Sequence, residues 1–199
     1  MNIKSYSKIN LTLKVNSKSK NGLHEIQSLY CWINLSDKIT INKIKNEKDT
    51  IRFKGPFGKF VNRDNSVSNL LKKMRELKLI SNYYSITVMK NIPVFGGLGG
   101  GTSNAAFILN YLLKNKISGS ILNKFINIIG SDLILFFKKQ GFLKNLRTVI
   151  ELKKRQKFHF VLTQPKIKCS TKEIYLNLNK FSKKEKFNKN IYKSRDKFL

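Results

Sequence analysis

The sequence predicts an α+β fold, and three observations support this prediction. Short segments in which apolar and polar residues alternate, as in half-buried strands, lie at 9–15, 39–41, 51–53 and 84–88. Two longer segments, 66–77 and 118–129, carry apolar residues three and four positions apart, which is typical of helices. A segment with five glycines in six positions, 96–101, separates the two halves. A chain of 199 residues can bury one good core or two small ones.

In the first half, the predicted strand at 9–15 is followed by a polar turn that ends at Gly22. Residues 24–32 mix polar and apolar types, and strands are expected at 39–41 and 51–53. Asn65 and Ser66 can cap the first helix. The apolar positions of this helix are Val67, Leu70, Leu71, Met74 and Leu77. The strand predicted at 84–88 leads into the glycine-rich segment.

In the second half, a helix is predicted at 118–129, and Gly130 ends it. We interpret residues 130–137 as an apolar strand with Asp132 near its start. Desolvation of a carboxylate at this position would be costly, which makes Asp132 a candidate for a functional role. A turn aspartate is the simpler alternative. A further strand is expected at 158–163, before Pro165, and the chain is rich in lysine and asparagine from 181 onward.

The glycine-rich segment predicts a phosphate-binding loop. Glycine costs conformational entropy in ordered structure, but without Cβ atoms successive amides can turn inward around phosphate oxygens. Thr102 or Ser103 can cap the apolar helix that follows, whose N-terminal end favours negative charge. The segment lacks the Gly-Lys-Ser/Thr of the P-loop and the glycine spacing of the dinucleotide fingerprint. A flexible linker is the alternative, and the hydroxyl cap and amphipathic run count against it.

The net charge of +29 is extreme and raises the possibility of an anionic partner such as nucleic acid. The lysines are spread along the chain among asparagine and isoleucine, and A/T-rich codons would produce the same mixture. We therefore favour compositional bias over a selected basic surface, although the positive field would attract an anionic nucleotide in either case. Aromatic residues do not recur among the lysines at regular spacing, so nucleic-acid binding is the less favoured alternative.

The sequence predicts a cytoplasmic protein with no membrane partner. It contains no apolar run long enough to cross a bilayer, and its first residues lack the apolar core of a signal peptide. The two cysteines, Cys31 and Cys169, are too few for a disulfide framework or a metal cluster. We expect each to be a buried small hydrophobic residue.

Residues 93–106 also resemble a known motif. The pattern Pro-x-x-Gly-Gly-Leu-Gly-Gly-Gly-Thr-Ser-Asn-Ala-Ala is similar to the phosphate loop of the galactose, homoserine, mevalonate and phosphomevalonate (GHMP) kinase superfamily. The triple glycine and the Asn-Ala-Ala resemble the 4-diphosphocytidyl-2-C-methyl-D-erythritol kinases of the non-mevalonate isoprenoid pathway. The resemblance implies a GHMP-kinase-like N-terminal domain, with a ribosomal protein S5 domain 2-like fold, over 1–150. Residues 151–199 would begin a truncated second α+β domain and carry the basic tail.

The resemblance also implies ATP- and Mg²⁺-binding residues, with Thr102 as the hydroxyl nearest the metal. Asn65 could approach the adenine, although a plain helix cap is the simpler role. The implied ATP-binding residues are Pro93, Gly96, Gly97, Leu98, Gly99, Gly100, Gly101, Thr102, Ser103 and Asn65.

Two further motifs imply the catalytic pair. The Ser-Lys-Ile-Asn-Leu at 7–11 resembles the first motif of the family, in which the lysine and asparagine face the substrate; here these are Lys8 and Asn10. The Gly-Ser-Asp-Leu-Ile at 130–134 resembles the family's Gly-Ala-Asp-Val-Pro, whose aspartate, here Asp132, is the catalytic acid/base. Serine and isoleucine replace the alanine and proline of that motif, so the local backbone can differ. An exposed strand lysine is the alternative for Lys8.

The substrate implied by the resemblance is 4-diphosphocytidyl-2-C-methyl-D-erythritol. Segment 21–28 resembles an Asp-Gly-Tyr-His-Glu-Leu motif that holds the cytosine, with His24 matching and Leu23 replacing the tyrosine. Thr171 and Tyr175 keep the spacing of a threonine and an aromatic residue that line the cytidine pocket, and at i, i+4 both would lie on one helix face. A turn histidine, a helix cap and a packing tyrosine are the structural alternatives.

The activity that the resemblance implies is ATP-dependent phosphorylation of the 2-hydroxyl of that substrate. Family members continue further and carry a Gly-Thr-Gly-rich segment near the C-terminus, whereas none of the eleven glycines here follows Gly141. We therefore expect a shortened second domain and a cleft completed by a homodimer or a separate chain. A non-catalytic remnant of the fold is the alternative to an enzyme.

Overall fold

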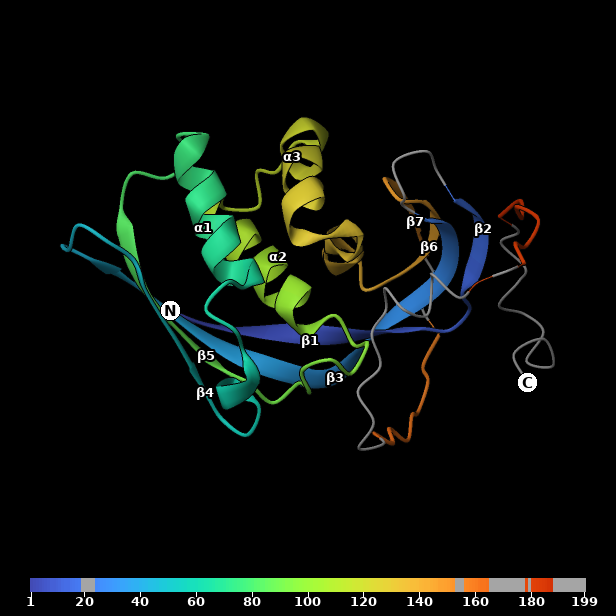
Figure 1. Ribbon diagram of the computed structural model, residues 1–199, viewed down its shortest axis with the longest axis horizontal. Coiled ribbons are helices and arrows are strands. Elements are labelled where there is room, and N and C mark those ends of the chain that lie inside the picture. Colours follow the sequence, from blue (N-terminus) through green and yellow to red (C-terminus); the bar gives the residue numbers. More distant parts are fainter. Residues whose placement is uncertain (19–23, 153–155, 165–177, 179, 188–199) are drawn as a thin grey trace.

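The computed structural model describes residues 1–18, 24–152, 156–164, 178 and 180–187. They include a seven-stranded sheet in which the order β4-β5-β3-β6-β7 forms the main path, with β1 and β2 also paired to β3. Helices α1, α2 and α3 all lie on one side of this sheet, and β2, β6 and β7 lie together at one end (Figure 1). The structure therefore has the mixed helix-and-sheet composition predicted from the sequence.

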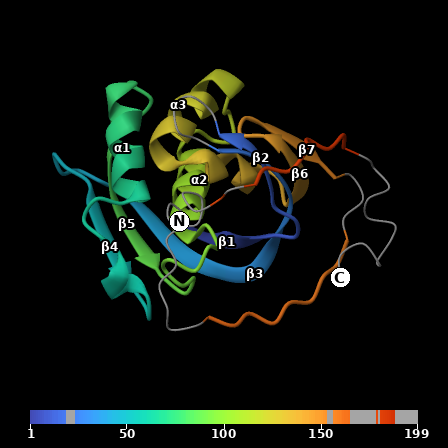
Figure 2. The same ribbon diagram turned by 45° about the vertical axis from the view of Figure 1, so that its right-hand side comes forward.

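The long strand β3 (His24–Ile44) is the centre of the sheet. It pairs antiparallel with β1 (Asn2–Asn10), β2 (Lys14–Lys18), β5 (Tyr83–Met89) and β6 (Gln140–Asn145), and Figure 2 shows it curving across the molecule. Six consecutive residues of this strand, 26–31, are buried. A strand covered on both faces loses its apolar–polar alternation, which explains why the sequence indicated only a mixed segment at 24–32 and a separate strand at 39–41.

The prediction of one continuous strand at 9–15 is wrong, because β1 ends at Asn10 and β2 begins at Lys14. The amides of Leu11 and Thr12 both donate to the carbonyl of Leu29, at 2.7 and 3.3 Å. The hydroxyl of Thr12 in turn accepts from the amide of Leu29 at 3.0 Å. Two amides on one carbonyl interrupt the ladder as a bulge does, while the sequence alternation continues through the break.

The predicted strands at 51–53 and 84–88 are confirmed as β4 (Thr50–Lys54) and β5, which pair in parallel. The predicted first helix is α1 (Ser66–Glu76), which connects these two strands after the short 3₁₀ helix η1 (Gly58–Phe60). Asn65 caps α1 as expected: its side chain accepts from the amides of Val67 and Ser68, and the Ser68 hydroxyl accepts from the Asn65 amide at 3.1 Å. This reciprocal capping box satisfies amides that the first turn would otherwise leave unpaired.

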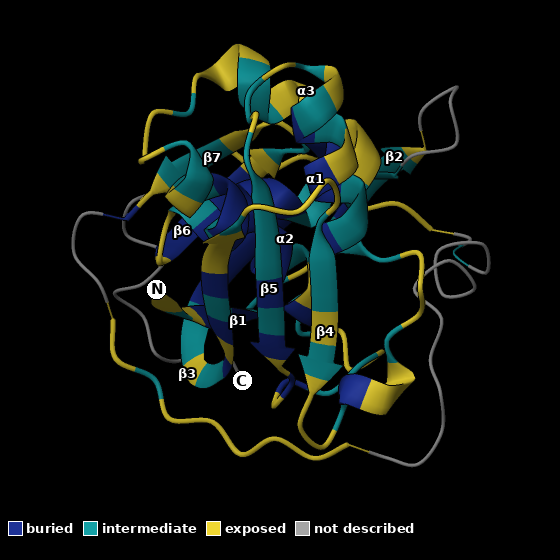
Figure 3. Ribbon diagram, turned by 90° about the vertical axis from the view of Figure 1, so that its left-hand side faces the viewer, coloured by how far each residue is buried: buried dark blue, intermediate teal, exposed yellow. Residues whose placement is uncertain are grey.

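Helices α2 (Gly100–Leu112) and α3 (Gly119–Ile129) complete the helical layer, and Ser118 caps α3 by accepting from the Ile121 amide. Figure 3 shows the buried residues gathered where the helices face the sheet. Cys31 is buried, as expected, while Cys169 lies outside the described residues. The largest fully buried side chains are Leu29, Tyr30, Ile39, Leu70, Met74, Ile86, Ile92, Ile108, Leu109, Phe125, Leu133 and Leu135.

The expected strand at 130–137 is a 3₁₀ helix, η2 (Ser131–Phe137). Four of its consecutive residues, Leu133–Phe136, are buried, and a short apolar run of this kind does not distinguish a strand from a buried helical turn. The hairpin of β6 and β7 (Thr148–Glu151) that follows was not predicted. The strand expected at 158–163 is also wrong, because residues 156–164 have no regular secondary structure and are largely exposed.

Among the residues that the structure describes, we find no helix with the length and apolar character needed to span a bilayer.

Candidate active site

A buried polar network lies beneath the glycine-rich loop, which we define as residues 93–103. The carboxylate of Asp37, on β3, accepts from the backbone amides of Asn91 and Ile92 at 2.7 and 2.8 Å. It also forms an ion pair with the ammonium of Lys90 and accepts from the side-chain amide of Asn104 at 2.9 Å. Because 91 and 92 precede the loop and 104 follows it, one carboxylate holds both ends of the loop.

The ion pair in this network is almost inaccessible to water, since the side chains of Lys90 and Asp37 are 3% and 0% exposed. Burial lowers the pKa of Lys90, while the charge of Asp37 and its hydrogen bond oppose this shift. The Lys90 ammonium also donates to Asn104 Oδ1 at 3.1 Å. Each charge therefore depends on polar partners inside the protein rather than on solvent.

The first turn of α2 is tied to β1 by a second set of buried hydrogen bonds. The hydroxyl of Ser103 donates to the carbonyl of Tyr6 at 2.6 Å and lies 2.7 Å from the hydroxyl of Ser5, which accepts from Asn104 Nδ2 at 3.0 Å. The prediction that Thr102 or Ser103 caps the helix is therefore wrong. The N-cap is Gly99, with a φ of 69°, and Ser103 instead anchors the helix to the sheet.

Two glycines of the loop are required by close packing. A Cβ atom on Gly99 would lie 2.8 Å from Phe136 Cζ and 3.4 Å from Lys8 Cε, and one on Gly100 would lie 2.9 Å from Ile92 Cγ2. Gly99 also has the positive φ that L side chains rarely adopt. The bare backbone thus lets the loop pack between β1 and η2.

The structure brings together Lys8, Asn10 and Asp132, three residues that the sequence analysis placed in the site. The Lys8 ammonium lies 3.1 Å from Asp132 Oδ2 and 3.4 Å from Asn10 Oδ1, and the Lys8 amide donates to the carbonyl of Leu98 in the loop at 3.1 Å. The Lys8 side chain is 5% exposed, whereas that of Asp132 is 34% exposed. A carboxylate that solvent or a ligand can reach therefore lies beside a buried ammonium group and the loop.

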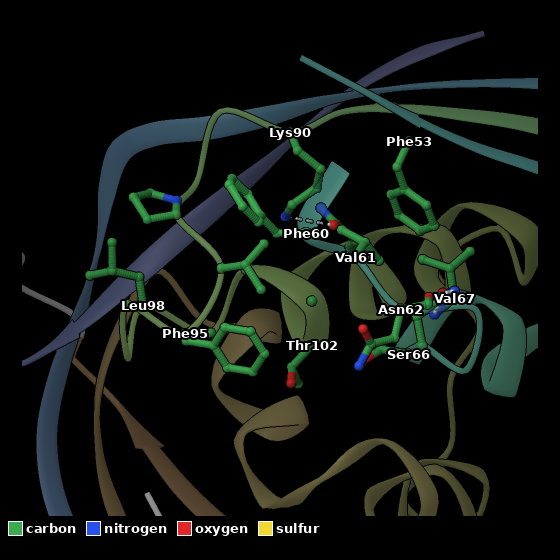
Figure 4. A pocket seen from close by; sticks show the side chains of 18 of the residues that line it. Phe53, Phe60, Val61, Asn62, Ser66, Val67, Lys90, Phe95, Leu98 and Thr102 are labelled. Atoms are coloured by element: carbon green, nitrogen blue, oxygen red, sulfur yellow. Dashed lines mark hydrogen bonds between the residues drawn. The ribbon is translucent and has the colours of Figure 1, made fainter. Parts of the chain in front are cut away.

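A cavity of about 340 Å³ opens along the loop. The loop and Thr102 form one wall, and Figure 4 shows apolar side chains, among them Phe53 and Val67, on the other. The first amides of α2 have no intrahelical acceptors, and the helix dipole makes this end attractive to anions. The cavity thus combines a wall whose free amides and helix dipole suit an anion with an apolar wall that suits a planar base.

Of the other predicted site residues, His24 lies apart from Lys8, Asp132 and the loop, Asn65 lines the cavity, and two lie outside the described residues. His24 is at the start of β3, where it is paired in register with Lys18 and stacks on Phe181 with ring centroids 6.4 Å apart. Asn65 lines the cavity, but its side chain also donates to the carbonyls of Asn62 and Arg63, so it is extensively engaged in the helix cap. Thr171 and Tyr175 lie outside the described residues.

Sequence reasoning missed three parts of this site: Asp37, Lys90 and the aromatic residue Phe95, which also lines the cavity. Lys90 lies three residues before the motif at 93–106, and this proximity is the one feature of the sequence that points to it. Nothing in the sequence around Asp37 indicates that its carboxylate is buried under a loop more than 50 residues further on.

The arrangement of this sheet, its helices and its glycine-rich loop defines the class of protein, which is the GHMP kinase fold. Among solved structures, the chain is similar to mevalonate pyrophosphate decarboxylase from Streptococcus pyogenes, with a TM-score of 0.50 and 13% identity, covering 71% of this chain and 46% of that one. A 4-(cytidine 5'-diphospho)-2C-methyl-D-erythritol kinase matches with a TM-score of 0.52 and 26% identity, covering 69% of this chain and 48% of that one.

Curated relatives then identify the family. The chain is 41% identical over 186 residues to the 4-diphosphocytidyl-2-C-methyl-D-erythritol kinase of Pelagibacter ubique, covering 91% of this chain and 66% of that protein. It is 33% identical over 182 residues to the enzyme of the same name from Buchnera aphidicola, covering 86% and 62%. No family model matches the sequence. The chain belongs to the 4-diphosphocytidyl-2-C-methyl-D-erythritol kinase family, and it spans 62–66% of the length of these relatives.

The buried network predicts a specific pattern of stabilities. Asp37→Ala should lower the free energy of unfolding by about 3–5 kcal/mol, because it leaves the Lys90 ammonium buried without its partner. The double variant Asp37→Ala/Lys90→Met removes both charges and should be clearly more stable than the single variant. Urea denaturation of both variants and of the wild type measures these differences. A single variant as stable as the wild type, or a double variant less stable than the single, would contradict this account.

Proposed function

We propose that this chain transfers the γ-phosphoryl group of ATP to the 2-hydroxyl of 4-diphosphocytidyl-2-C-methyl-D-erythritol, in the non-mevalonate route to isoprenoid precursors. Two relatives named as this kinase support the proposal, as described above. The single observation that carries it is the 3.1 Å contact between Lys8 and Asp132 beside the glycine-rich loop. Phosphoryl transfer needs a cradled triphosphate, a positioned hydroxyl and charge stabilisation, and these elements could provide all three.

In this proposal the triphosphate lies along Gly96–Ser103, where backbone amides and the N-terminal end of α2 donate to its oxygens. The carboxylate of Asp132 accepts the proton of the substrate hydroxyl while that oxygen forms a bond to the γ-phosphorus and ADP leaves. The ammonium of Lys8 donates to Asp132 and stabilises the negative charge that develops on the attacking oxygen.

The residues around the loop fit a requirement for Mg²⁺ supplied with ATP. No group of three or more His, Cys, Asp or Glu residues that could hold a metal occurs among the described residues. Mg²⁺ in kinase sites takes most of its ligands from phosphate and water, so such a group is not needed. Thr102, on the cavity wall, is the hydroxyl we propose beside the ion. When bound, Mg²⁺ neutralises charge on the phosphate oxygens.

We extend the proposal to substrate binding and domain organisation. Asn10 would contact the substrate next to Lys8, and His24, Thr171 and Tyr175 would bind its cytidine end. Residues 1–150 would form the ATP-binding domain, and 151–199 would begin the second domain. The other wall of the cleft would come from a second copy of this chain or from a separate chain. We propose the cytoplasm as its location.

The acid/base assignment predicts the behaviour of Asp132→Asn. This variant keeps the shape of the side chain but cannot accept the proton, so turnover should fall by roughly 10²–10⁴-fold while affinity for Mg²⁺-ATP changes little. Transfer of labelled γ-phosphoryl to 4-diphosphocytidyl-2-C-methyl-D-erythritol measures the rate, and calorimetric titration measures ATP binding. Glu47→Gln, at an exposed site, is the matched control and should keep the wild-type rate.

Undiminished turnover by Asp132→Asn would remove Asp132 as the base. A wild-type chain that binds ATP but transfers no phosphoryl group, even with protein concentration raised to favour self-association, would instead indicate the non-catalytic alternative.

The proposed charge role of Lys8 predicts a separate effect for Lys8→Met. Methionine retains an apolar stem that can pack against the loop but lacks the ammonium, so kcat should fall at least about tenfold with little change in the free energy of unfolding. Lys4→Met, an exposed lysine on the same strand, is the control. Steady-state kinetics with paired urea denaturation test this prediction, and an unchanged kcat for Lys8→Met would show that the ammonium has no part in the reaction.

A further inference from the structure

Phe95, in the glycine-rich loop, has an unfavourable backbone and an unfavourable environment at the same time. Its φ is 63°, in the left-handed region that favours glycine, and its side chain is 63% exposed although it is large and apolar. Gly97 adopts a similar φ of 69° two residues further on. Glycine at position 95 would adopt the same backbone without strain, and strain of this kind is concentrated at functional sites.

The ring of Phe95 lines the cavity described above. Figure 4 shows it extending from the loop toward the side of the cavity where Thr102 lies. Phe60, which is 51% exposed, lines the same cavity from the segment before α1. In the described structure, two largely exposed aromatic rings thus line the same cavity as the backbone of the glycine-rich loop.

The chemistry of an aromatic ring decides which part of a nucleotide Phe95 can contact. The face of a phenyl ring carries the negative part of its quadrupole, so it does not favour phosphate oxygens. The same face stacks well on a planar base or on the apolar side of a sugar. A triphosphate held by the loop amides would therefore leave the ring to cover the nucleoside part of the ligand.

We propose that Phe95 is a specificity-determining residue, which covers the base and ribose of the bound nucleotide and so makes the site prefer a nucleoside triphosphate over inorganic triphosphate. This inference rests on the proposed function, because it needs ATP in the cavity. Binding of the nucleotide removes the ring from water and thereby offsets the cost of its backbone conformation.

The test compares two ligands on three variants, by calorimetric titration in the presence of Mg²⁺. Phe95→Gly should weaken ATP binding by roughly 10- to 100-fold, the range expected for loss of one aromatic stack, and leave inorganic triphosphate binding unchanged. Its melting temperature should stay at or above the wild-type value, because glycine accepts the backbone angle. Phe95→Trp should restore most of the ATP affinity.

Lys114→Gly is the matched control, since Lys114 has a φ of 51° at the other end of α2 and does not line the cavity. It should leave both affinities at the wild-type value.

Three outcomes would overturn the inference. Phe95→Gly with wild-type affinity for ATP would show that the ring does not contact the nucleotide. An equal loss of affinity for ATP and inorganic triphosphate, or a lowered melting temperature, would show that Phe95 stabilises the loop conformation rather than contacts the nucleoside. A wild-type chain that binds neither ligand would overturn both the proposed function and this inference. The first two results, in contrast, would overturn only the role of Phe95.

Discussion

The position of the glycine-rich loop depends on one buried carboxylate. Asp37 of β3 accepts from two backbone amides just before the loop and from the side chain of Asn104 just after it, and it pairs with Lys90. Burying these amides and charges without hydrogen-bond partners would cost free energy, so the conformation in which all of them are paired is strongly favoured. The loop is therefore anchored at both ends by the central strand of the sheet, at the edge of the cavity.

The same placement brings distant parts of the sequence to the loop. β1 carries Lys8, whose amide bonds to the loop and whose ammonium reaches Asp132 on η2, more than 120 residues further along the chain. The close approach of Phe136 and Lys8 to Gly99 depends on the missing Cβ atom. The loop thus packs against β1 and η2, and it also lines the cavity in which we propose that the triphosphate binds.

The elements predicted correctly, α1, α2, α3, β4 and β5, carry apolar and polar residues at the spacing of their element, so that the two faces of each differ. The sequence failed where burial removes that asymmetry, in the six consecutive buried residues of β3 and in the apolar run of η2. Local motifs predicted the meeting of Lys8, Asp132 and the loop. Asp37 and Phe95 could not be found in this way, because long-range hydrogen bonds and a positive φ leave no local pattern.

Whether the loop and the start of α2 bind the triphosphate can be measured from amide chemical shifts during a titration with Mg²⁺-ATP. Binding at the loop requires that the largest shift changes fall on Gly96–Thr102 and reach saturation at one nucleotide per chain. Shifts spread over the lysine-rich surface, with the loop amides unchanged, would contradict it.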